Sequence, residues 1–370
     1  MKIGVSFEAN RFSGGGFQQA VNAVLLMKER ASSENELVFL VTEEQGKQDL
    51  ADRGIEAKLV KIGRMGRLIT RMRRSMRFNH LLTRLGIDNP LDNQMDCLGI
   101  DLVYFTGPSR LALMLERTNY IFTVWDLCHR DWVEFPEVRN HLAFEARELL
   151  FRMALTKATA VLADSELGKE NIARRYGVDL ERVQVLPFSP AAHLNKPEES
   201  ACRNENIRIK FNLGERFLFY PAQFWPHKNH LYVIDAISIL RQQKGHEVHV
   251  VFSGAHGGNM PQVKAMAKEA GVEDLIHFPG FVSDQDLSAL YEEALAMVMP
   301  TYFGPTNLPP LEAFRVGTPV LYSDLPGMRE QVGDAAILLD LSNPDSLAQA
   351  IRKLIENPTE TQNLIQAGKE

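Results

Sequence analysis

Short apolar runs alternate with longer amphipathic stretches along the chain. The apolar runs are rich in β-branched and aromatic residues and predict buried parallel strands. In the first half they cover Lys2–Phe7, Leu37–Thr42, Leu102–Thr106, Tyr120–Asp126, Ala158–Asp164 and Val183–Phe188. In the second half they cover Phe217–Pro221, Val248–Ser253, Ile276–Pro279, Ala296–Pro300, Pro319–Ser323 and Ala335–Leu339. Strands that alternate with helical patterns indicate βαβ units and therefore an α/β fold.

The stretches between the strands have helical spacing. Helices are predicted at Leu231–Gln242, Asp284–Ala294 and Asp345–Ile355, the last with Asn343 as N-cap and Pro344 at its first position. Ser189–Asn206 has no apolar period, so we expect an interdomain linker there. We predict two Rossmann-like, doubly wound domains, residues 1–190 and 206–370, that face a central cleft at the carboxyl ends of their strands.

Composition and charge narrow the class of protein. The 370 residues are 45% hydrophobic and 24% charged, which is typical of a globular protein and excludes disorder. The net charge of −6 gives no overall attraction to nucleic acid. Cys97, Cys128 and Cys202 lie far apart, which argues against a zinc site or a disulfide framework. The N-terminal apolar run ends at Glu8, too early for a secretory signal, so we expect a cytoplasmic protein that is not integral to a membrane.

The segment Met299–Asp340 carries the strongest chemical signal. A predicted strand leads into a loop rich in Gly, Pro, Thr and Asn, and Pro309 and Pro310 then open a helix, where a missing N–H costs little. We expect the other backbone N–H groups of the loop and helix start to bind an anion. Glu312, in the first turn of that helix, has the chemistry to accept hydrogen bonds from two vicinal ribose hydroxyls. The alternative is that Glu312 only complements the helix dipole.

This segment resembles the donor site of glycosyltransferase family 4, among the group 1 nucleotide-sugar-dependent enzymes of GT-B fold. The match extends through LPPLEAFRVGTPVLYSDLPGMREQVGDAAILLD. The family has another Glu eight residues before Glu312, where this chain has Gly304. In the family that Glu helps to hold the donor sugar. The resemblance therefore implies a sugar pocket lined by Gly304, Pro305, Thr306, Asn307 and Leu308, with Thr306 and Asn307 replacing the lost carboxylate.

Two further segments resemble donor-binding parts of the same family. In FLFYPAQFWPHKNH, Lys228 matches the lysine that meets the donor diphosphate, and Gln223 stands where the family usually has Arg. The alternative for Lys228 is a solvated loop lysine, and we expect His227 and His230 to be ordinary surface histidines. Phe281 and Val282 match the loop whose backbone groups and aromatic side chain meet the nucleobase.

The glycines of FSGGGFQQ follow the first predicted strand and open a helix that runs to Arg30. Gly14, Gly15 and Gly16 allow close backbone approach. Gln19 stands where the dinucleotide-binding fingerprint needs its third glycine, which disfavours a dehydrogenase. The resemblance implies that Gly15 and Gly16 approach the donor diphosphate; the alternative is a flexible turn.

Candidate acid–base residues follow a strand of the first domain. Asp126 and His129 lie in a stretch where the family often has His-Asp-Leu, with Trp125 here in place of that His. They are candidates for a base toward the acceptor hydroxyl or for binding donor hydroxyls, and with Lys228 and Glu312 they complete the predicted catalytic set. The alternative is that Asp126 caps a helix whose first turn contains His129.

We expect no metal site and no cofactor beyond the donor itself. The one DxD sequence, Asp284-Gln285-Asp286, lies at a predicted helix start, where capping explains it better than metal binding. This expectation agrees with the GT-B group that the chain resembles.

Residues 57–87 contain no acidic residue but many basic ones: Lys58, Lys61, Arg64, Arg67, Arg71, Arg73, Arg74, Arg77 and Arg84. Apolar residues recur among them at spacings of three and four: Ile62, Met65, Ile69, Met72 and Met76. This pattern predicts a helix on an anionic membrane surface, with contact through residues 58–84 at the inner face of the membrane. The alternative is a helix docked on the first domain's sheet with a solvated basic rim.

The resemblance implies a glycosyltransferase that moves a sugar from a nucleoside-diphosphate sugar to a glycan or a polyprenyl- or lipid-linked acceptor. It also implies retention of configuration, no protein nucleophile, and a role in bacterial-type surface polysaccharide or lipopolysaccharide assembly. Because Gly304 and Gln223 depart from the family, an inactive sugar-nucleotide-binding partner subunit stays an alternative. A GT-B sugar-nucleotide epimerase is a second alternative, but that reaction needs several acid–base carboxylates and the sequence has few at strand ends. Family members usually end with a helix that returns to the first domain, so we expect Glu370 to be a truncation point.

Overall fold

The structure is a computed structural model that describes residues 1–9, 14–73, 76–190, 206–243, 246–255 and 258–370. At residues 70, 71, 76, 77, 79 and 83 it describes the backbone only. Most of the predicted linker, residues 191–205 with Cys202, lies outside the described residues, as does the start of the glycine loop at Phe12 and Ser13.

Contacts divide the chain into two compact units. The first comprises Met1–Leu127 and Phe144–Pro187, and the second comprises Cys128–Ala143 and Phe188–Glu370. Residues 128–143, which we expected in the first domain, therefore pack with the second unit. Nothing in their sequence signals this, because the contacts responsible come from residues far along the chain.

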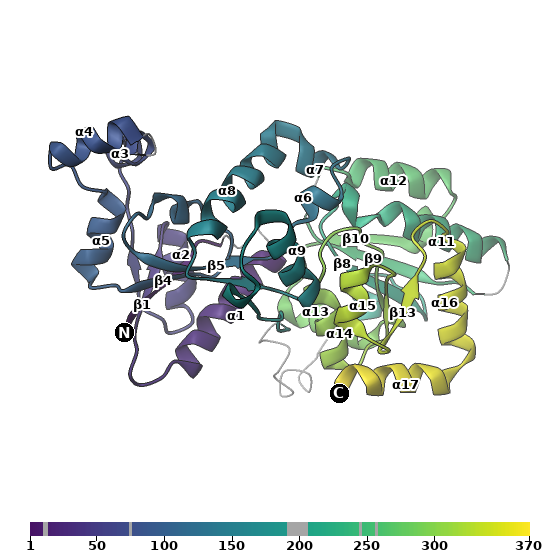
Figure 1. Ribbon diagram of the computed structural model, residues 1–370. Helices are drawn as coiled ribbons and strands as arrows, with labels where there is room; N and C mark the ends of the chain where they lie inside the picture. The colour runs from purple at the N-terminus through teal and green to yellow at the C-terminus, as the bar shows by residue number, and fades with distance from the viewer. Residues whose placement is uncertain (10–13, 74–75, 191–205, 244–245, 256–257) are drawn as a thin grey trace. The chain divides into compact units, whose positions relative to one another are not determined.

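The first unit is built on a parallel sheet with the strand order β3-β2-β1-β4-β5-β6-β7 (Figure 1). Its strands are β1 (Lys2–Phe7), β2 (Glu36–Val41), β3 (Ala57–Leu59), β4 (Leu102–Phe105), β5 (Asn119–Val124), β6 (Ala160–Ala163) and β7 (Val183–Val185). All but β3 were predicted. The β3 strand is only three residues long and contains Lys58, so it gives no apolar run.

Helices connect these strands. They are α1 (Gly15–Arg30), α2 (Glu44–Ala51), α3 (Arg64–Arg73), α4 (Met76–Arg84), α5 (Pro90–Leu98), α8 (Ala143–Lys157) and α9 (Glu166–Tyr176), with 3-10 turns η2 (Arg110–Met114) and η4 (Leu180–Arg182). Side-chain caps fix the starts of α5 and α9. Asn89 Oδ1 accepts from the Leu91 N–H at 3.0 Å, and Ser165 Oγ accepts from the Gly168 N–H at 3.0 Å.

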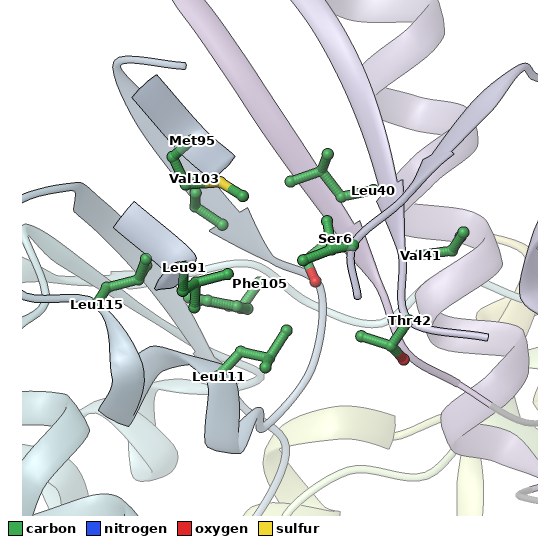
Figure 2. A pocket seen from close by; sticks show the side chains of 11 residues that line it. Ser6, Leu40, Val41, Thr42, Leu91, Met95, Val103, Phe105, Leu111 and Leu115 are labelled. Atoms are coloured by element: carbon green, nitrogen blue, oxygen red, sulfur yellow. The ribbon is translucent and has the colours of Figure 1, made fainter. Parts of the chain in front are cut away.

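The first sheet is buried on both faces, which explains its continuous apolar runs. In β4, Val103 and Phe105 belong to one hydrophobic cluster, whereas Tyr104 between them belongs to another. Figure 2 shows a pocket in the former cluster, where Leu91 and Met95 of α5 approach β4. Apart from Ser6 and Thr42, its lining is apolar, and none of the predicted site residues lines it. We therefore assign this pocket to core packing.

The second unit contains a parallel sheet with the strand order β10-β9-β8-β11-β12-β13. Its strands are β8 (Phe217–Pro221), β9 (His249–Ser253), β10 (Ile276–Gly280), β11 (Ala296–Met299), β12 (Val320–Ser323) and β13 (Ala336–Leu339). All were predicted, with ends that differ by at most one residue. One large cluster that includes Phe217, Phe219 and Tyr291 forms the core.

The helices of the second unit are α6 (Cys128–Asp131), α7 (Pro136–Arg139), α10 (Ile207–Lys210), α11 (His230–Gln242), α12 (Met260–Glu269), α13 (Asp284–Glu293), α14 (Leu308–Val316), α15 (Pro326–Val332), α16 (Asp345–Glu356) and α17 (Pro358–Lys369). Its 3-10 turns are η3 (Asn140–Leu142), η7 (Pro226–Lys228) and η8 (Glu273–Leu275). Helix α16 begins at Asp345, as predicted, but its N-cap residue is Pro344 rather than Asn343. Asn343 Oδ1 still accepts from the Asp345 N–H at 3.1 Å.

Each unit is thus a doubly wound Rossmann-like sheet, as predicted. The strand order reverses between β1 and β4 in the first unit and between β8 and β11 in the second. In such sheets the crevice outside the carboxyl ends of the strands at this reversal is where ligands bind. Among the helices of the described residues, none combines the length and hydropathy that crossing a bilayer requires.

Candidate functional site

The loops that follow β8 and β11 bring Lys228 and Asn307 together. Lys228 ends the turn η7 after β8, and Asn307 immediately precedes α14 after β11. The Lys228 Nζ donates to Asn307 Oδ1 at 3.3 Å, and Tyr220 Oη donates to the Lys228 carbonyl at 2.6 Å. Both residues were predicted to meet the donor. The contact means that Lys228 is more than a solvated loop lysine.

Two residues that the sequence did not reveal hold Asn307 in place. The Gln331 side chain of α15 accepts from the Asn307 N–H at 2.9 Å and donates to the Asn307 carbonyl at 2.6 Å. The Asn307 Nδ2 donates to Tyr322 Oη, on β12, at 2.7 Å. These contacts join separate elements, so no local motif marks them.

The backbone at Gly304 leaves no room for a side chain in place of the glycine. Gly304 has φ of 90°, and a Cβ there would lie 2.6 Å from the Thr306 carbonyl oxygen. Any side chain at this position would be strained. Pro305 approaches Gly327 so closely that a Cβ there would meet it at 2.6 Å, and the Leu308 side chain is buried. The loop therefore presents Thr306, Asn307 and its backbone rather than a carboxylate.

Glu312 lies in the second turn of α14, not the first, because the helix begins at Leu308. Its side chain is buried, and Tyr291 Oη donates to Oε2 at 2.7 Å. Burial raises the pKa of Glu312, and the hydrogen bond from Tyr291 opposes this only in part. The dipole effect is confined to the first turn. It therefore does not explain Glu312, which stays a candidate for binding ribose hydroxyls.

His227 and His230 are buried, so the prediction of surface histidines is wrong. The His230 ring stacks on Tyr220 and Phe224 with centroid distances of 4.8 and 4.6 Å. Burial lowers the pKa of His230 to about 3, and the charge of Lys228 adds to this effect, so the ring is neutral. The His227 ring stacks on Phe303 at 4.0 Å. Both rings pack the turn that carries Lys228.

Glu137 of α7 binds the turn η7 through His227, a contact that the sequence did not predict. Its Oε1 accepts from the His227 backbone N–H at 3.0 Å and contacts the ring Nδ1 of the same residue. Burial opposes ionisation of Glu137, but the hydrogen bonds from His227 outweigh it and lower the pKa of Glu137. An ionised carboxylate only accepts, so His227 Nδ1 carries a proton.

The predicted pair Asp126 and His129 falls on two different units. Arg147 of α8 donates to Asp126 Oδ1 at 3.3 Å within the first unit. His129, on α6, belongs to the second unit and is fully buried. Asp126 and His129 both stay candidates for the roles predicted from the sequence.

The other predicted donor contacts lie on separate elements. Gly15 and Gly16 are the first residues of α1, with Gly14 as N-cap. Gln223 Oε1 accepts from Trp225 Nε1 at 2.7 Å. After β10, Phe281 is 62% exposed, as a platform for a base requires, whereas Val282 packs against the core.

The DxD sequence lies in the first turn of α13, at the predicted helix start, but the N-cap side chain is Ser283. Ser283 Oγ caps α13 by accepting from the Asp286 N–H at 3.1 Å, and the Asp286 carboxylate pairs with Lys210 at 3.0 Å. In the part of the chain that the structure describes, no group of three or more His, Cys, Asp or Glu side chains is placed to hold a metal ion.

Comparison with known proteins adds to this geometry. Residues 203–370, which cover most of the second unit, match the family model described as glycosyl transferases group 1. The MMP alpha-(1->4)-mannosyltransferase of Mycolicibacterium hassiacum is 26% identical over 243 residues, which are 65% of this chain and 53% of that protein. The O-antigen chain mannosyltransferase B of Escherichia coli is 23% identical over 264 residues, or 70% of this chain and 66% of that protein. The chain thus spans about half to two thirds of these relatives.

Solved structures share the fold over the whole chain. Anabaena Alr3699/HepE, crystallised with UDP-glucose, has a TM-score of 0.75 at 16% identity and covers 100% of this chain and 93% of its own. WaaG, described as a glycosyltransferase involved in lipopolysaccharide biosynthesis, has a TM-score of 0.69 at 15% identity. The match covers 100% of this chain and 94% of the WaaG chain. The predicted GT-B fold is therefore confirmed.

Proposed function

We propose that the chain is a nucleotide-sugar-dependent glycosyltransferase of the family 4 type. It moves a sugar from a nucleoside-diphosphate sugar to a glycan or lipid-linked acceptor in surface polysaccharide assembly, with retention of configuration and without a metal. The names of the relatives, mannosyltransferases that include an O-antigen chain enzyme, support this function, and they make mannosyl donors the first to test.

One observation carries the proposal. The group 1 match covers residues 203–370, and within it the loops at the β8–β11 reversal bring Lys228 to Asn307. An ammonium group held in a crevice at the carboxyl end of a sheet is suited to a diphosphate. On this basis Lys228 stabilises the charge that develops on the leaving diphosphate, and Glu312 holds the ribose.

The test uses the purified chain with UDP-, GDP- and dTDP-sugars. A true donor at about 100 times its dissociation constant contributes about 2.7 kcal/mol to stability, which a thermal shift detects. Release of nucleoside diphosphate that depends on an acceptor supports the transferase, and unchanged turnover in EDTA supports metal independence. Binding with neither release nor transfer indicates a partner subunit. Conversion of the donor sugar without an acceptor indicates an epimerase, and absence of binding contradicts the proposal.

The basic segment supports a second part of the proposal, contact with an anionic membrane. Helices α3 and α4 and the turn after α4 expose large apolar side chains, between 48% and 68% accessible: Met65, Leu68, Phe78, Leu81 and Leu85. Arg64, Arg67 and Arg84 are exposed on the same two helices. Apolar side chains beside basic ones are typical of a surface that inserts among anionic headgroups.

The predicted apolar stripe of this segment is only partly correct. Ile62 packs against the core of the first unit, whereas Met65 is exposed. Arg73 is also not available to a membrane, because its side chain is buried, pairs with Glu116 at 2.9 Å and donates to the Ile87 carbonyl. The side chains of Arg71, Arg74 and Arg77 lie outside the described residues. The contact is therefore assigned to the exposed residues named above.

Flotation with vesicles separates the two contributions. We expect the chain to bind anionic vesicles but not neutral ones, and charge neutralisation at Arg64, Arg67 and Arg84 to weaken binding. Leu68→Ser with Leu81→Ser should weaken it as well. Leu180→Ser is the matched control, since Leu180 is 53% exposed elsewhere in the first unit. Failure of the wild-type chain to bind, or equal loss in the control, contradicts membrane contact and leaves the transferase proposal untouched.

A further inference from the structure

The side chain of Gln331 clamps the backbone of Asn307. Its Oε1 accepts from the Asn307 N–H at 2.9 Å, and its Nε2 donates to the Asn307 carbonyl at 2.6 Å. Tyr322 Oη, which is buried, donates to the same Gln331 oxygen at 3.0 Å. Paired hydrogen bonds of this kind fix both the position and the direction of the clamped peptide.

The chemistry of its neighbours decides which way the Asn307 amide points. The Phe303 carbonyl only accepts, so it requires Nδ2, which donates to it at 3.2 Å. The Lys228 ammonium only donates, so it requires Oδ1, which accepts from it at 3.3 Å. Tyr322 Oη accepts from Nδ2 at 2.7 Å, which agrees with the same orientation. A flipped amide would set an NH2 group against the ammonium.

We propose that Gln331 and Tyr322 are positioning residues for Lys228. They fix Asn307, and Asn307 in turn holds the ammonium where the loops after β8 and β11 meet. This inference rests on the proposed function, because the anion that Lys228 meets is then the diphosphate of the donor. Gln331 and Tyr322 act through Asn307 and need not touch the donor themselves.

Two variants test the clamp, with the dissociation constants of UDP and GDP measured by calorimetry. Gln331→Leu removes both hydrogen bonds to the Asn307 backbone, so Asn307 no longer holds the Lys228 ammonium in place. We expect nucleoside diphosphate binding to weaken about tenfold or more, the size expected when a hydrogen bond from a charged group is lost. Tyr322→Phe should weaken binding less, because the Phe303 carbonyl still holds Nδ2. In turnover assays kcat should fall as the donor KM rises, because a displaced Lys228 also stabilises less of the charge that develops on the leaving diphosphate.

Tyr232→Phe is the matched control for a buried tyrosine hydroxyl. Tyr232 Oη donates to the carbonyls of Asp340 and Asn343, and we expect the variant to bind UDP and GDP as the wild type does. Melting temperatures measured in parallel show that each variant is folded. Wild-type affinity in folded Gln331→Leu and Tyr322→Phe would overturn the inference while the transferase proposal stands. If the wild type binds neither nucleotide, the proposed function fails and the clamp has no role.

Discussion

The two units reverse their strand order in the same way, yet they fill the carboxyl ends at the reversal differently. In the second unit Lys228 and Asn307 meet there through polar contacts. In the first unit the Trp125 indole lies against glycines that follow β1 and β4. A Cβ added at Gly16 would come within 2.8 Å of the ring, and one at Gly107 within 2.4 Å. Topology supplies the crevice, but the side chains decide whether it is suited to an anion or filled by packing.

Lys228→Ala should have the largest effect, because it removes the charge from the polar contacts of the second unit. Loss of a preorganised charge at a site of developing charge costs roughly 100- to 1000-fold in rate, so we expect kcat/KM for transfer to fall by about that factor. Steady-state kinetics with the identified donor measure it. Lys210→Ala is the control, because Lys210 pairs with Asp286 in the same unit and should leave transfer unchanged. Wild-type turnover in Lys228→Ala would place the donor diphosphate elsewhere.

Gly107→Ala should disrupt the packing of the Trp125 ring in the first unit. The new methyl group would overlap the Trp125 ring, and overpacking of this kind typically costs about 1–3 kcal/mol of unfolding free energy. Denaturant titration measures the loss, and Trp125→Leu in the same chain should recover part of it. Gly46→Ala in α2 is the control, since the new Cβ would lie 3.6 Å from its nearest neighbours, Phe7 and Val41. Nucleotide binding by the second unit should not change in either variant, and a fully stable Gly107→Ala would contradict the packing role of Trp125.

The sequence predicts features that leave a local pattern, but it does not predict contacts between separate elements. All strands except β3 were predicted because parallel strands buried on both faces leave a local apolar pattern. Lys228 and Asn307 were predicted because they lie in motifs beside such strands. The sequence did not reveal the roles of Gln331, Tyr322 and Glu137 because each contacts a residue in a different element. The prediction that His227 and His230 lie on the surface was wrong because their rings stack on Phe303 and Tyr220 and are buried.

Glu312→Gln should give the smallest effect. It is also a specific test, because we expect the stability of the folded chain to rise while donor binding weakens. Burial raises the pKa of Glu312 above 4.5, so the folded chain holds this proton more tightly than the unfolded chain does. Stability therefore falls as pH rises from about 4.5 through the raised pKa, and above it the ionised carboxylate opposes folding. A Gln side chain cannot ionise but still accepts from Tyr291, so the variant should unfold at higher denaturant at neutral pH.

Donor binding should move the other way in the same Glu312→Gln protein. A neutral amide accepts ribose hydroxyls less strongly than a carboxylate, so UDP or GDP should bind several-fold more weakly. Pyrophosphate, which has no ribose, should bind as before because Lys228 is intact. Glu293→Gln is the control, since Glu293, the last residue of α13, pairs with Arg208 at 3.1 Å and should change neither property. An equal loss of pyrophosphate binding would mean that Glu312 shapes the Lys228 side of the crevice rather than holding the ribose.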